Sequence, residues 1–105
     1  MEEELARELD RPDGVEDAET AVEVLRAWIG DGALLVSLNS SAFGDQVGDW
    51  GRLLAEIGHH VAKSAALNGF MSEAAAQAAL SEAFLATFET RSGPTSGKLR
   101  GRLKH

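Results

Sequence analysis

The chain has 105 residues, a net charge of −7 and no cysteine. A chain of this length forms one small domain that buries about 65% of the surface of its unfolded state, and without cysteine it has neither disulfides nor thiolate zinc ligands. No apolar run approaches the ~20 residues of a membrane span, and the N-terminus is acidic where a secretory signal is basic and then apolar. The sequence therefore predicts a cytoplasmic protein without a membrane span.

Charge is distributed unevenly along the chain. Residues 1–20 carry nine acidic side chains against two basic ones, whereas residues 91–105 carry five basic side chains and no acidic one. Because charged termini are usually solvated, we expect an acidic, partly disordered segment over 1–20, a single domain over 21–91 and a flexible basic tail over 92–105. An alternative is that the tail contacts a polyanion or the acidic N-terminal segment; its candidate residues for a polyanion contact are Lys98, Arg100, Arg102 and Lys104.

Residues 21–39, AVEVLRAWIGDGALLVSLN, predict a β-hairpin. Two β-prone runs flank Gly30-Asp31-Gly32, and a two-residue turn from this triplet folds them back on each other. Either choice of turn residues places the same apolar side chains on one face of the hairpin: Leu25, Ala27, Ile29, Leu34, Val36 and Leu38.

A helix is the competing interpretation for the first of these runs. Apolar residues also recur there at helical spacing from Ala18 to Ile29, with Gly30 placed as a C-cap. We favour a strand from about Val22, because the second run then finds partners on the same face across the turn.

Two helices are predicted after the hairpin. Asp45 or Asp49 offers an N-cap for a helix that stops at Asn68-Gly69, and Ser72 starts a second helix that continues to about Thr90. The first helix has an apolar stripe made of Trp50, Leu53, Leu54, Ile57, Val61 and Ala65. The second is rich in alanine, and its predicted buried side comprises Ala76, Leu80, Ala83, Phe84 and Phe88.

The order strand, strand, helix, helix predicts an α+β fold in which the β-hairpin packs on two helices (ββαα). A two-stranded sheet is only marginally stable alone and leaves two edges unpaired. The second face of the hairpin also carries apolar residues, the candidate dimer contacts Val22, Val24, Trp28 and Leu35. We therefore expect a homodimer, either completed edge to edge as a four-stranded sheet or packed face to face on this second face.

No set of residues in the sequence predicts a reaction. His59 and His60 point about 100° apart on a helix, whereas two ligands of one metal need a spacing of three or four residues. The glycines do not form a phosphate-binding loop, and the serines lack the context of a nucleophile elbow. We predict no catalytic residue, no cofactor and no metal site.

At EVLRAWIGDGALLVSL followed by WGRLLAEIGHHVA, the chain resembles a family of small bacterial domains of unknown function. The family has a strand ending in an aromatic residue, an Asp-Gly turn, a second strand similar to LHVSL and a helix that opens near a tryptophan. The resemblance covers about Ala21 to Phe88 and leaves out the basic tail, and Leu35 stands where the family has a polar or histidine residue. It implies the hairpin and assigns no activity.

These observations favour a small, non-enzymatic, homodimeric interaction or accessory module. One alternative is binding of nucleic acid or an anionic surface through the basic tail, which the acidic body of the protein disfavours. The other is a small-molecule site in a cleft between Trp50, His60 and the hairpin.

Overall fold

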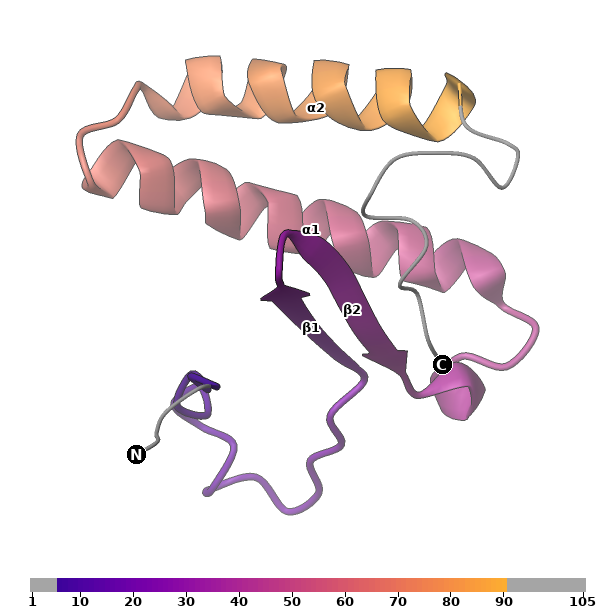
Figure 1. Ribbon diagram of the computed structural model, residues 1–105. Coiled ribbons are helices and arrows are strands. Elements are labelled where there is room, and N and C mark those ends of the chain that lie inside the picture. Colours follow the sequence, from indigo (N-terminus) through magenta and orange to yellow (C-terminus); the bar gives the residue numbers. More distant parts are fainter. Residues whose placement is uncertain (1–5, 91–105) are drawn as a thin grey trace.

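The computed structural model describes residues 6–90. Its elements are the strands β1 (Leu25–Gly30) and β2 (Ala33–Leu38), the short 3-10 helix η1 (Ser40–Ala42), and the helices α1 (Val47–Leu67) and α2 (Glu73–Thr90). Residues 6–24 contain no helix or strand. The hairpin lies in front of α1, and α2 runs along the far side of α1 (Figure 1). The predicted α+β class and the ββαα order are confirmed.

β1 and β2 form a two-stranded antiparallel sheet. The turn residues Asp31 and Gly32 have φ angles of 52° and 80°, which is the backbone of a type I′ turn. Trp28 pairs with Leu35 in the resulting register. The predicted strands and their faces are therefore confirmed and the helical interpretation is wrong, although β1 begins at Leu25 rather than near Val22.

The end of α1 follows the prediction. The N–H of Phe70 donates to the carbonyl of Ala65 at 2.9 Å, and the N–H of Gly69 donates to Ala66 at 3.0 Å. Gly69 has a φ of 76°. This is a Schellman motif, in which a left-handed glycine satisfies the last carbonyls of a helix, and it confirms the stop predicted at Asn68-Gly69.

The start of α1 differs from the prediction. The N-cap position is Gln46, with no capping bond from its side chain, and Asp49 lies in the first turn, where Arg52 donates to it at 2.8 Å. The prediction that Asp45 or Asp49 caps the helix is wrong. The chain enters α1 through a backbone bond instead, because the N–H of Gln46 donates to the carbonyl of Phe43 at 2.9 Å.

The two helices contact each other through small residues. Ala62 of α1 is fully buried and Ala76 of α2 is 4% exposed. Figure 1 shows the helices diverging away from the loop that joins them. The prediction that Phe84 and Phe88 are buried is wrong, since they are 51% and 73% exposed; both belong to the second half of α2.

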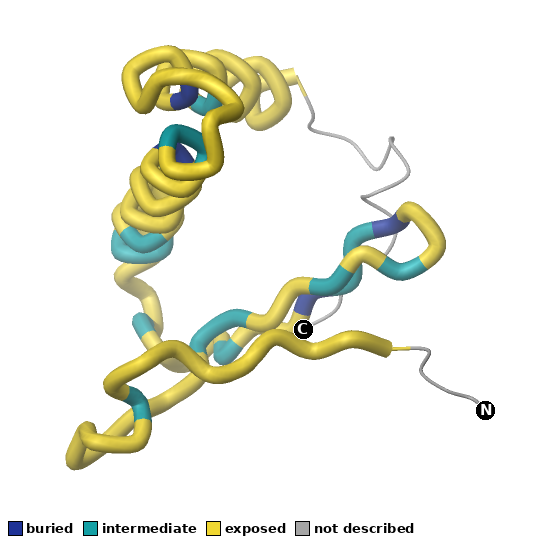
Figure 2. Tube along the Cα trace, turned by 90° about the vertical axis from the view of Figure 1, so that its left-hand side faces the viewer, coloured by how far each residue is buried: buried dark blue, intermediate teal, exposed yellow. Residues whose placement is uncertain are grey.

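The hairpin stands apart from the helical pair. No Cα atom of β1 or β2 lies within 8 Å of one in α1 or α2, and Figure 2 shows the two units separated from each other except near η1. The buried residues accordingly fall in two places, Ala33 and Val36 in β2 and the alanine contact between the helices. Within residues 6–90, Ile29 and Leu38 of the hairpin remain exposed, whereas Ala33 and Val36 are buried.

Candidate interaction surface

One face of the hairpin is wholly apolar and partly exposed. Val36 is 9% exposed, but Ile29 is 67% exposed and Leu38 is 36% exposed. The register makes this face continuous, because its residues pair directly across the strands: Leu25 with Leu38, Ala27 with Val36, and Ile29 with Leu34. This set of six residues is called the apolar face below.

The opposite face carries the candidate dimer contacts. Trp28 and Leu35 are direct cross-strand partners and both are half-buried. Gly30 makes room for Leu35, whose Cδ1 lies only 3.0 Å from the point where a Cβ at residue 30 would be. Val24 is half-buried, and Val22 is 67% exposed in the segment that leads into β1. The structure thus brings Trp28 and Leu35 together, and their role between two copies stays a prediction.

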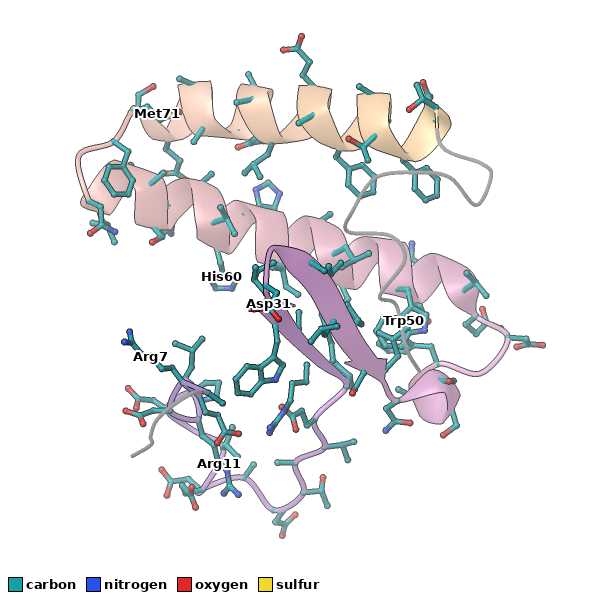
Figure 3. All side chains as sticks on the ribbon, in the orientation of Figure 1. Arg7, Arg11, Asp31, Trp50, His60 and Met71 are labelled. Atoms are coloured by element: carbon teal, nitrogen blue, oxygen red, sulfur yellow. The ribbon has the colours of Figure 1, made fainter. Side chains whose placement is uncertain are left out.

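The N-terminal segment lies beside β1. Residues 7–12 and residues 25–28 line a common cavity of about 510 Å³. Arg26 pairs with Glu8 at 2.7 Å and with Glu23 at 3.1 Å, and these carboxylates, Glu23 first, raise the pKa of Arg26. Figure 3 shows Arg7 and Arg11 in this segment, away from the helices. The sequence did not predict this contact, because a pair 18 residues apart leaves no periodic signal.

The two outer edges of the hairpin are open among the described residues. No backbone hydrogen bond within residues 6–90 joins the outer side of β1 or β2 to another segment. Unpaired strand edges are templates for pairing with another chain. The edges are therefore part of the candidate interaction surface.

An apolar groove runs between α1 and α2. It has a volume of about 460 Å³, and its large side chains stay partly open, with Ile57 41% exposed and Leu85 52% exposed. The apolar stripe predicted for α1 contributes one wall of this groove. The large apolar residues that line it are Leu54, Ile57, Val61, Leu80, Phe84 and Leu85.

Trp50 and His60 lie well apart along α1. Trp50 packs edge to face on Phe43, with ring centroids 5.0 Å apart, and His60 is exposed. Ten residues of helix place the two about 15 Å apart along α1, and Figure 3 shows them well separated below that helix. His59, not His60, lines the groove. Within residues 6–90 there is no group of three or more side chains that would hold a metal ion.

The basic tail lies outside the described residues, and so do Lys98, Arg100, Arg102 and Lys104. Residues 6–90 carry fourteen acidic and five basic side chains, a net charge of −9. None of the helices in this described part has the length and apolar character needed to cross a membrane.

The fold and its open surfaces define a small α+β domain with a ββαα order. The chain belongs to the family described as "Domain of unknown function (DUF5076)", which matches residues 8–92. This confirms the resemblance inferred from the strand and turn motifs.

One similar solved structure is described as that of "a putative pyruvate dehydrogenase from the photosynthetic bacterium Rhodopseudomonas palustrus CGA009". It has 35% sequence identity and a TM-score of 0.66, and the match covers 88% of this chain and 93% of that one. A comparison with curated proteins found no match.

Proposed function

We propose that the protein is a non-enzymatic, homodimeric interaction or accessory module of the cytoplasm. The observation that supports this most strongly is the hairpin: Ala27, Ile29 and Leu38 of its apolar face are exposed, and among residues 6–90 no backbone hydrogen bond reaches its two outer edges. An isolated two-stranded hairpin is only marginally stable in water. A second copy supplies the missing surface, and a two-fold dimer is the commonest closed assembly.

Two kinds of contact would stabilise such a dimer. Fully burying one large aliphatic side chain contributes about 1.5–3 kcal/mol, and Val22 and Ile29 at the hairpin are each 67% exposed. A micromolar complex requires about 8 kcal/mol in total. New backbone hydrogen bonds at a strand edge and the covering of apolar side chains next to it are the favourable terms, and they must exceed the entropy lost on association.

The pyruvate dehydrogenase description belongs to the similar structure and is not part of this proposal. Sequence identity over nearly the full length supports a shared fold, and a shared fold does not by itself carry an activity.

Light scattering and thermal unfolding test the proposal. At tens of micromolar we expect a mass twice the 11.1 kDa of one chain, and a melting temperature that rises with protein concentration, because association stabilises only the folded state. A monomer mass well above micromolar concentration, with a melting temperature independent of dilution, would show that the proposal is wrong.

A further inference from the structure

The backbone groups that point out of the hairpin can be assigned from its register. The N–H of Asn39 donates to the carbonyl of Val24 at 3.0 Å, so this pair is hydrogen-bonded, and hydrogen-bonded pairs alternate along an antiparallel ladder. The pairs Ala27/Val36 and Ile29/Leu34 are then non-hydrogen-bonded pairs, whose backbone N–H and C=O groups point away from the partner strand. On β2, the residues whose N–H and C=O point away from β1 are Leu34, Val36 and Leu38.

The edge of β2 is better suited to pairing than the edge of β1. β2 contains no charged residue, no proline and one polar residue, Ser37, and an apolar edge strand without such protection invites another strand. β1 contains Arg26 and has residues 7–12 beside it, held in part by the ion pair between Arg26 and Glu8 at 2.7 Å. Pairing through β2 therefore displaces nothing that the structure describes.

We propose that β2 pairs antiparallel with β2 of a second copy about a two-fold axis at Val36, which gives a four-stranded sheet in the order β1-β2-β2-β1. This inference rests on the homodimer proposed above and specifies its geometry. Each Val36 lies opposite Val36 of the other copy, and each Leu34 lies opposite Leu38 of the other copy.

The hydrogen bonds select this register. With the axis at Val36, the outward groups of all three outward-facing residues of β2 find partners within the opposite β2 strand. With the axis one residue earlier, at Leu35, the outward groups of Leu38 face Gly32, a turn residue with a φ of 80° that is not part of a strand. The axis at Val36 is the register that leaves no outward group of β2 unpaired.

The same register joins the two apolar faces into one. Side chains alternate between the faces of a sheet, so pairing Val36 with its own copy keeps every residue of the apolar face on the same side of the four-stranded sheet. Two narrow strips become a single continuous apolar surface. An odd shift of the register would turn one copy's strip to the other side.

Single cysteines test the inference, because the natural chain contains none. In a hydrogen-bonded antiparallel pair the Cα atoms lie about 5.5 Å apart, which fits a disulfide. We expect Val36→Cys to form a disulfide-linked dimer as its main species on mild oxidation, read on a non-reducing gel. We expect a mixture of Leu34→Cys and Leu38→Cys to cross-link, whereas each alone does not.

The matched control is Ala27→Cys, at the position of β1 that pairs with Val36. In the proposed sheet the two copies of residue 27 lie three strand spacings, about 14 Å, apart, so this variant stays unlinked. Cross-linking of Ala27→Cys, or of Leu35→Cys in preference to Val36→Cys, overturns the inference. The inference is also overturned if the natural chain is dimeric by light scattering but neither Val36→Cys nor the mixture of Leu34→Cys and Leu38→Cys cross-links. In that case the protein is still a homodimer, but with another geometry. A monomeric natural chain defeats the proposed function itself.

Discussion

At Asp31 and Gly32, two residues determine how the rest of the hairpin pairs. Both have positive φ, a conformation that costs about 1–2 kcal/mol for a residue with a side chain. Asp31 tolerates it because a short polar side chain can bond the local backbone, and Gly32 has no side chain to clash. This turn fixes the register of the two strands, and the register determines which residues form the apolar face.

Replacing Gly32 by alanine tests the turn. We expect Gly32→Ala to lower the free energy of unfolding by about 1–2 kcal/mol, because a φ of 80° disfavours a Cβ. The measurement is urea unfolding at fixed protein concentration. The control is Gly51→Ala within α1, where a Cβ meets nothing within 4 Å and stability should rise by about 0.5–1 kcal/mol. Equal effects of the two substitutions would contradict the type I′ turn.

Local signals of this kind could be read from the sequence. The turn, the glycine stop after α1 and the cap of α2, where the N–H of Ala75 donates to the Ser72 hydroxyl at 3.1 Å, each depend on one or two adjacent residues. The ion pair between Glu8 and Arg26 could not be read, because it depends on where residues 6–24 run. The capping role expected of Asp45 or Asp49 failed because a backbone bond supplies the entry to α1.

Among the elements, the helical pair depends on small side chains. Ala62 has no exposed surface and Ala76 has 4%, so the two helices approach closely where these alanines lie. A larger side chain at that contact has no free space, and overpacking a tight contact typically costs 1–3 kcal/mol.

Enlarging the alanine contact tests its role. We expect Ala62→Leu to lower the free energy of unfolding by about 1–3 kcal/mol, measured by urea unfolding at fixed protein concentration. The control is Ala78→Leu, an exposed position of α2, where leucine is also a good helix former and the change should stay within about 0.5 kcal/mol. An Ala62→Leu variant as stable as its control would show that the helices do not pack closely at this point.

The elements were more predictable than their packing. Periodicity identified both helices and both strands nearly to their ends, because each signal repeats within one segment. Which face is buried depends on neighbours that the pattern does not contain. Phe84 and Phe88 illustrate this, since their spacing predicts a buried side, yet the structure leaves them exposed and stacked on each other at 5.5 Å.

For the whole molecule, the charge distribution favours the proposed function over the polyanion alternative. Residues 6–90 have a net charge of −9, which repels phosphate groups and opposes any attraction from the tail. Any attraction of the candidate tail residues to a polyanion is therefore opposed by the negative electrostatic potential of residues 6–90. Sequence alone was sufficient for this comparison, because net charge does not depend on the fold.

Binding to duplex DNA tests this balance. At about 0.15 M salt we expect no measurable change in the fluorescence anisotropy of a labelled duplex with the full chain, and the same result with a chain lacking residues 92–105. Binding by the full chain alone, with an affinity that falls steeply as salt rises, would identify the tail as a polyanion contact and favour the alternative function.

The candidate interaction surface was predictable in part. The sequence predicted that Trp28 and Leu35 are apolar residues on the second face of the hairpin. Their cross-strand pairing confirms that they lie side by side there. The open apolar face was not anticipated, because the helices were expected to cover it. The groove between α1 and α2 was also missed, since the apolar stripe of α1 was read as buried rather than as one wall of an open channel.

The outer edge of β2, which no residue within 6–90 pairs with, also has a consequence for how the protein is made. A newly synthesised chain that has folded before meeting a partner presents ALLVSL, without a charge or proline to deter other strands, and such a segment is an aggregation hazard while it is unpaired. Pairing with a second folded copy then competes with incorrect pairing of β2 to exposed strands of other newly made chains. The yield of native protein should depend on how quickly two chains associate. Expression at low temperature, or co-expression with chaperones, should increase this yield.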